Sequence, residues 1–273
     1  MSRIVFLNGD YLPAEQAKIS IFDRAVNFGD AIYEVAGVLE GKLVDFEHHM
    51  QRYFSSLEKL EIKSPLEQEQ ILEAFRKLVE LNRLDEGLVY MQVTRGEAER
   101  DFVWPEDIEP NVFMFTQAKA SIENQAATDG IALASTADIR WARRDIKSVN
   151  LLAQVLAKKA AADAGAYEAL MVDADGYVTE CGSTSFFIVK GDLILTRPLS
   201  NDILPGVTRR AVVARIQALA DDPRPRGCVK LTGADKYRVR QGAYRILYTV
   251  HDDRVVVSVV RVAHRKSVYR QVE

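Results

Sequence analysis

Apolar residues recur at helical and strand spacing along the first part of the chain. Between Phe46 and Leu60 they fall every three or four residues, which places them on one face of a helix. Residues 66–82 repeat this spacing and predict a second helix. Two β-rich runs around Asn8-Gly9-Asp10 predict a hairpin. Residues 19–28 lack a period and are expected to be irregular. Further strands are expected at 31–35, 88–94 and 111–116.

The pattern changes after residue 118. Residues 119–127 are polar and without a period, as in a linker. An Ala- and Leu-rich stretch predicts a helix at 150–164 that Gly165 ends, and another helix is expected at 207–220. Short β-rich runs predict strands at 131–135, 168–172, 177–179, 185–189 and 193–195, and an antiparallel meander at 237–241, 244–250 and 255–262.

Composition is that of an ordinary soluble protein, with 273 residues of which 48% are hydrophobic and 27% charged. No run of about eighteen apolar residues and no basic-then-apolar leader occurs, so neither a membrane span nor a secretory signal is indicated. The two cysteines form no disulfide framework, which favours the cytoplasm. Residues 216–273 hold 12 Lys and Arg against 6 Asp and Glu, although the whole chain has a net charge of −3. This asymmetry suggests segments with different partners.

Lys147 stands where a polar extended segment turns into an apolar helix. Its primary amine is the group that forms a Schiff base with an aldehyde. Pyridoxal phosphate needs such an amine, an acid for its ring nitrogen and a cradle for its phosphate. Glu180 is a candidate acid, and Gly206-Val207-Thr208 offers helix N-terminal amides and a hydroxyl. Arg52 offers a guanidinium fork for the phosphate. No metal site is expected.

Each of these residues also has an ordinary interpretation. Taken singly, Lys147 and Arg52 are more typical of solvated surface charges, and Glu180 of a turn carboxylate. Tyr33 alone is more typical of a core or strand-face tyrosine. Their order along one chain is what favours the functional interpretation.

Six short motifs in a fixed order resemble the class IV (fold type IV) pyridoxal-phosphate aminotransferases over residues 1 to about 213. They are Asp23-Arg24, Gly29-Asp30-Ala31-Ile32-Tyr33-Glu34, Val93-Thr94-Arg95-Gly96, Asp145-Ile146-Lys147-Ser148-Val149-Asn150, Thr179-Glu180 and Leu204-Pro205-Gly206-Val207-Thr208-Arg209. The D-amino-acid aminotransferase branch is the most similar, because Arg100 follows Arg95-Gly96. Many members carry a histidine two places after that arginine, where this chain has Phe102.

This resemblance implies a role for each candidate residue. Lys147 would form the internal aldimine and then move a proton between the substrate Cα and C4′ of the cofactor. Glu180 would pair with the ring nitrogen, Tyr33 would lie beside the substrate, and Arg100 would face its α-carboxylate. The groups that hold the phosphate would be Arg52, Gly206, Val207 and Thr208.

The resemblance also implies an α+β fold. A small α/β domain would span residues 1–118, the linker 119–127, and a larger, mostly β, open-barrel-like domain would bind the cofactor from residue 128 to 215. The expected function is transamination between D-amino acids and 2-oxo acids by a cytoplasmic homodimer. A branched-chain L-amino-acid transaminase or a lyase of the same fold is the alternative.

Residues 216–273 resemble the second half of a RelE/ParE-type toxin instead. The first strand and first helix of that family have no counterpart before residue 216. Ribosome-dependent members of that family cleave mRNA. The resemblance implies that the residues serving this cleavage would be Arg238, Arg240, Arg245, Arg265 and Tyr269. A cationic sheet face suits a phosphate backbone, so an RNA- or ribosome-binding module is an alternative of another class. The ordinary interpretation is a sheet that completes the second domain. Residues 209–219 would be a helix common to both families, whether the chain is a natural fusion, an assembly artefact or a deliberate chimera.

Overall fold

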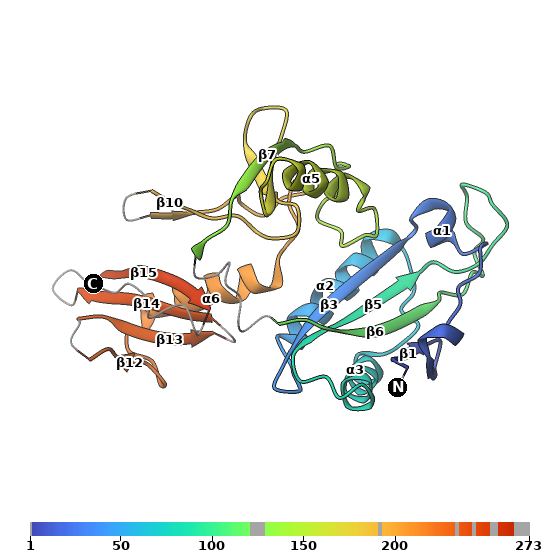
Figure 1. Cartoon of the computed structure of the whole chain (residues 1–273), viewed down its shortest axis with the longest axis horizontal. Helices are drawn as coiled ribbons and strands as arrows, with labels where there is room; N and C mark the ends of the chain where they lie inside the picture. The colour runs from blue at the N-terminus through green and yellow to red at the C-terminus, as the bar shows by residue number, and fades with distance from the viewer. Residues whose placement is uncertain are drawn as a thin grey trace. The chain divides into compact units, whose positions relative to one another are not determined.

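The computed structural model describes residues 2–120, 129–190, 193–232, 235–241, 244–251 and 256–264. The chain divides into two compact units (Figure 1). The first comprises residues 1–120, 140–153 and 200–204, and the second comprises residues 121–139, 154–199 and 205–273. Most of the predicted linker lies outside the described residues, so the domain boundary at 119–127 stays a prediction.

The first unit is built on a six-stranded antiparallel sheet in the order β2-β1-β6-β5-β3-β4. Asn8 and Gly9 turn the N-terminal hairpin with φ values of 48° and 105°, as a two-residue turn with left-handed backbone requires. The hairpin and the three further strands predicted for this region are therefore confirmed. The strands are β1 (Ile4–Leu7), β2 (Asp10–Pro13), β3 (Ala31–Leu39), β4 (Lys42–Leu43), β5 (Gly87–Thr94) and β6 (Val112–Ala118).

Helices α2 (Phe46–Leu60) and α3 (Gln68–Leu81) pack against one face of this sheet and form its core (Figure 1). Met50 and Phe75 from the helices and Ile32 and Val89 from the strands are completely buried there. Burying a side chain of this size stabilises the fold by roughly 1.5–3 kcal/mol. Both helices predicted from the apolar period are confirmed, and α2 has the predicted bounds.

A short helix, α1 (Arg24–Phe28), lies in the stretch predicted to be irregular. Asp23 begins it, because its carboxylate accepts a hydrogen bond from the amide of Ala25 at 2.7 Å. Gly29 ends it in the left-handed conformation with a φ of 68°. The irregular prediction was wrong here because a five-residue helix is too short to show an apolar period.

The second unit begins with open sheets. Strands β7 and β8 are parallel, and β9 pairs with β8 in the antiparallel sense. Ala157 and Ala161 of the following helix pack against Ala169 and Met171 of this sheet. The elements are β7 (Leu133–Ala137), α5 (Leu152–Asp163), β8 (Glu168–Val172), β9 (Val178–Cys181) and the separate pair β10 (Ile188–Lys190) and β11 (Leu193–Leu195).

Helix α6 (Val207–Asp221) leads into a four-stranded antiparallel sheet. Leu219 of α6 is completely buried against Val239, Ile246 and Tyr248 of that sheet. The predicted meander is confirmed, and a two-residue strand too short to show alternation precedes it. The strands are β12 (Val229–Lys230), β13 (Tyr237–Gln241), β14 (Tyr244–His251) and β15 (Val256–His264). None of the helices in the described ranges is both long and apolar enough to span a bilayer.

Candidate active site

Lys147 lies on a short extended segment that runs antiparallel to the start of β3. The amide of Tyr33 donates to the carbonyl of Lys147 at 3.0 Å, and the amide of Val149 donates to the carbonyl of Ala31 at 3.1 Å. The amide of Lys147 donates to the hydroxyl of Ser56 on α2 at 3.2 Å. The backbone of Lys147 is therefore fixed to both the sheet and the helix.

The Lys147 side chain lies over an aromatic surface. Its Nζ is 4.1 Å from the centroid of the Tyr33 ring. Tyr33 stacks on Tyr90 at 5.6 Å, and Tyr90 stacks on Phe115 at 4.7 Å. Burial, and secondarily the neighbouring Tyr33, raises the pKa of Tyr90 to about 12. Alternation along β3 directs Tyr33 away from the face that α2 and α3 cover. The amine and the predicted substrate-facing tyrosine thus lie together on the sheet's other face.

Arg52 on α2 is buried, unlike the solvated surface charge that its residue type alone favours. Its side chain is 9% exposed, and its Nε and one terminal nitrogen each donate to Glu34 at 2.8 Å. His49 Nδ1 lies 2.8 Å from the same carboxylate. Burial raises the pKa of Glu34, but the hydrogen bonds from Arg52 and His49 outweigh it, so the pKa lies below its usual value.

Glu34 and His49 received no role from the sequence. The available signal was the position of Glu34 in β3, because residues 32, 36 and 38 face the core and an acid at position 34 shares that face. A charge on a buried strand face requires a partner. Arg52 of α2, the helix that covers this face, is that partner, although the sequence pattern assigned it to the phosphate.

Asp145 fixes the Lys147 segment from its other end. Its carboxylate forms ion pairs with Lys59 at 2.9 Å and with Arg143 at 3.1 Å. Burial raises the pKa of Asp145, but the hydrogen bonds from Arg143 and Lys59 outweigh it, so the pKa lies below the usual value. Asp145 therefore supports the segment as an anion at neutral pH.

Arg100 lies on an exposed loop between β5 and β6. Its guanidinium lies over the rings of Phe28 and Phe102, at 5.3 and 5.7 Å from their centroids. Within the part of the chain that the structure describes, it makes no hydrogen bond and no ion pair, and no ring contact joins it to Tyr33. The structure therefore leaves its donors available to an anion, and among the described residues Arg100 makes no direct contact with Lys147.

The remaining predicted residues belong to the second unit. Glu180 is 8% exposed on β9, and the neighbouring Thr179 hydroxyl donates to the carboxylate of Asp138 at 2.7 Å. Gly206 precedes α6, and no side chain caps that helix. Gly206 has no side chain that could cap the helix, and Val207 and Thr208 are its first two residues. A Cβ at position 206 would lie 2.7 Å from the hydroxyl oxygen of Ser185, which favours glycine.

The donor set suits pyridoxal phosphate. The first unit supplies a half-buried amine, and the second supplies a buried carboxylate and an uncapped helix start, which are the three contributions that this cofactor requires. In the described residues no group of three His, Cys, Asp or Glu side chains is arranged to hold a metal ion.

Comparisons with known proteins agree with both halves of the sequence pattern. Residues 31–221 match the model of the family described as amino-transferase class IV. Residues 207–269 match the model of the ParE toxin of type II toxin-antitoxin systems. The chain is 37% identical to the D-alanine aminotransferase of Staphylococcus aureus over 206 residues, which are 75% of this chain and 72% of that relative. It is 36% identical to the D-alanine aminotransferase of Listeria monocytogenes over 213 residues, covering 77% and 73%.

Solved structures have the same fold. The branched-chain amino acid aminotransferase of Escherichia coli superimposes with a TM-score of 0.73 at 19% identity, covering 96% of this chain and 86% of that one. The branched-chain aminotransferase of the thermophilic archaeon Thermoproteus uzoniensis, solved with norvaline, gives a TM-score of 0.69 at 20% identity, covering 97% and 90%.

Proposed function

This chain belongs to the class IV aminotransferases, and we propose that it exchanges the amino group between D-amino acids and 2-oxo acids with pyridoxal phosphate as its cofactor. Lys147 and Arg52 of the first unit and Glu180, Gly206, Val207 and Thr208 of the second would hold the cofactor. The similarity to D-alanine aminotransferases supports the D-amino-acid specificity. The exposed guanidinium of Arg100, which makes no ion pair among the described residues, supports its role as the receptor of the α-carboxylate.

When bound, pyridoxal phosphate supplies an aldehyde for the amino group and a ring that accepts the electron pair released at the substrate Cα. Lys147 Nζ would bind this aldehyde between turnovers, and its amine would move a proton between the substrate Cα and C4′ of the cofactor. Tyr33 fixes the position of this amine through the 4.1 Å ring contact. Glu180 would pair with the ring nitrogen and keep it protonated, and Arg100 would orient the substrate through its α-carboxylate.

The observation that carries this proposal is the placement of Lys147 Nζ over Tyr33 by a segment pinned to β3 and α2. Pyridoxal phosphate added to the full-length protein should produce a visible absorbance band that Lys147→Ala abolishes. Lys159→Ala is the matched control, because Lys159 is an exposed lysine on α5 whose side chain is 69% accessible. Equal spectra for wild type and Lys147→Ala would refute the assignment of the amine.

The substrate class is tested separately. Wild-type protein should transfer the amino group of D-alanine to 2-oxoglutarate faster than that of L-leucine. The reverse preference would identify a branched-chain L-amino-acid transaminase, the alternative that shares this fold. A D-preference that disappears in Arg100→Gln would assign the carboxylate contact to that residue.

We infer further that the enzyme works as a homodimer in the cytoplasm. Phe102 and Val103 on the Arg100 loop are 77% and 78% exposed, and an apolar loop of this kind suits a subunit contact. Cys181 and Cys228 are both free thiols, which suits a reducing compartment. Sedimentation equilibrium of the purified chain measures the subunit number, and a monomer at micromolar concentration would contradict the dimer.

A second candidate function concerns the sheet after α6. Strand register places Arg240 opposite Arg245 on neighbouring strands, and Arg238 lies on the same face as Arg240, away from the core residue Val239. We propose that this face binds a nucleic-acid backbone. Arg265 and Tyr269 lie outside the described residues. RNA binding that weakens steeply with salt and is reduced in the Arg238→Gln/Arg240→Gln variant would support it, and salt-independent or absent binding would remove it.

A further inference from the structure

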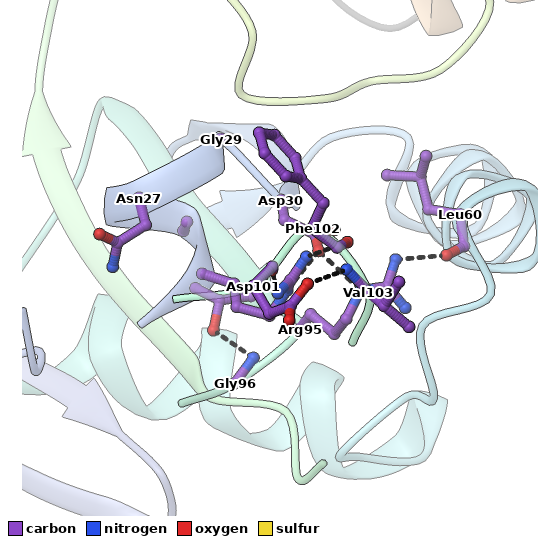
Figure 2. Close-up of polar contacts among 12 residues, drawn as sticks. Asn27, Gly29, Asp30, Leu60, Arg95, Gly96, Asp101, Phe102 and Val103 are labelled. Carbon is purple, nitrogen blue, oxygen red and sulfur yellow. Dashed lines mark hydrogen bonds and ion pairs between the residues drawn. The ribbon is translucent and has the colours of Figure 1, made fainter. Parts of the chain in front are cut away.

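A buried pair of arginines fixes the loop that carries Arg100. Arg24 and Arg95 both donate through Nε to the same oxygen of Asp30, at 2.9 and 2.7 Å. Both arginine side chains are 4% exposed, and that of Asp30 is 13% exposed. Figure 2 shows Asp30 and Arg95 directed toward one another beside the backbone of Asp101 and Phe102. Two cations on one carboxylate leave a cluster rich in donors, and these reach outward to the surrounding backbone.

The two arginines bind different parts of the backbone. Arg95 donates to the carbonyls of Leu60 and Glu61 at the end of α2, at 2.6 and 3.0 Å. Arg24 donates through its terminal nitrogens to the carbonyls of Asp101 and Phe102, at 2.7 and 3.3 Å. The Asp30 carboxylate thus links the end of α2 to the exposed loop. The hydrogen-bond acceptors on the loop are backbone carbonyls, which a substitution cannot remove. The Arg24 guanidinium is therefore the side of this contact that a substitution can test.

The loop position decides where the Arg100 guanidinium lies. The Phe102 ring packs against Phe28 at 5.5 Å, and the guanidinium of Arg100 lies over both rings. The Arg24 guanidinium lies over Phe28 as well, at 4.5 Å. Arg24 therefore contacts both the backbone of Phe102 and the ring on which Phe102 and Arg100 pack. A side chain as long as arginine loses substantial rotamer freedom when it is held, and a preformed loop reduces that cost at binding.

We propose that Arg24 is a positioning residue that fixes the 97–104 loop and through it the Arg100 guanidinium. This inference rests on the proposed role of Arg100 as the carboxylate receptor. Arg24→Lys is the test variant, because lysine keeps the charge beside Asp30 but has no planar fork to span two carbonyls. Arg3→Lys is the matched control, since Arg3 donates to the carbonyl of Thr116 and lies over Phe115, away from the loop.

Hydrogen–deuterium exchange of the full-length chain measures how readily the loop opens, without any catalytic assay. Peptides that span residues 97–104 should exchange about tenfold faster in Arg24→Lys, which is the effect of losing roughly one charge-assisted hydrogen bond. Peptides from α2 and α3 should exchange as in wild type, and Arg3→Lys should leave the loop unchanged. Unchanged exchange at 97–104 in Arg24→Lys would overturn the proposal, even if the protein were inactive as a transaminase.

Half-reaction kinetics test the consequence for the substrate. Arg24→Lys should lower kcat/KM for D-alanine about tenfold and leave the rate with ethylamine, which lacks a carboxylate, unchanged. In an Arg100→Gln background the same substitution should have no further effect, because the two residues act on one contact. Equal losses with both amines, or additive losses in the double variant, would mean a general structural role and would overturn the proposal. No D-alanine activity in wild type would refute the proposed function instead, and the exchange data would still decide the loop.

Discussion

Replacing Glu34 by glutamine removes the negative charge from a site without solvent access. The Glu34 side chain is 0% exposed and accepts two hydrogen bonds from Arg52 and one contact from His49, all at 2.8 Å. Removing one partner of a buried ion pair costs about 3–5 kcal/mol, because the other charge stays buried. Glutamine keeps one acceptor oxygen, so we expect about 3 kcal/mol. With an m value of about 2 kcal/mol/M, the urea midpoint should fall by about 1.5 M.

The pH dependence of this loss has a defined sign. The pKa of Glu34 in the folded protein lies below its unfolded value. Its charge therefore contributes stability that is complete above the unfolded pKa and is lost as the pH falls through the folded pKa. The difference between wild type and Glu34→Gln should be full at pH 7 and should narrow below about pH 4, where the wild-type carboxyl also takes up a proton.

Urea unfolding of the cofactor-free protein, followed by circular dichroism at pH 7 and below about pH 4, measures this loss of stability. Glu47→Gln is the control, on the helix that carries Arg52, because Glu47 is exposed and its carboxylate accepts a hydrogen bond from the side-chain amide of Gln68 at 2.7 Å. We expect that substitution to change stability by less than about 0.5 kcal/mol. A loss equally small for Glu34→Gln, or a loss that grows as the pH falls, would refute the assignment of Arg52 and Glu34 as a buried ion pair.

Two further predictions concern single substitutions that lower stability. Gly96 has a φ of 119°, and a Cβ there would lie 2.0 Å from the carbonyl of Glu109, so Gly96→Ala should lower the unfolding free energy by more than about 2 kcal/mol. Gly9→Ala is its control, because Gly9 shares a positive φ but has open space around it, and equal losses would contradict the steric explanation. Tyr248→Phe should cost about 1–2 kcal/mol in urea unfolding, since it leaves the carbonyl of Pro223 without its 2.8 Å donor, and no loss would show that this hydrogen bond is not stabilising.

The sequence predicted the elements whose evidence is local. The apolar period of α2 spans four turns, so Met50, Tyr53 and Leu57 identified its buried face without any knowledge of the sheet. Helix α1 was not predicted, because five residues are too few to show an apolar period. Its start is marked only by the N-cap at Asp23. Strand β12 was not predicted either, because two residues are too few to show alternation.

The same distinction between local and remote evidence holds for the candidate site. The resemblance assigned Lys147 to the cofactor and Tyr33 to the substrate, and their contact arises from the register of the Lys147 segment against β3. The buried charges were not predicted, because their partners are remote. Arg52 reaches Glu34 over 18 positions, and Arg24 reaches the carbonyl of Asp101 over 77. No spacing rule joins such residues, so only the fold shows which carboxylate or carbonyl of the chain a motif arginine contacts.

Helix α6 carries the match to both families, because the two matched ranges overlap at residues 207–221, and these are the bounds of the helix itself. The change from one matched family to the other therefore falls inside a continuous helix rather than in a loop. Leu219 is completely buried against the strands that follow, so cutting the chain after residue 221 to obtain a minimal aminotransferase would leave an apolar surface bare. The four-stranded sheet covers the apolar face of α6, and a truncated protein without that sheet should aggregate.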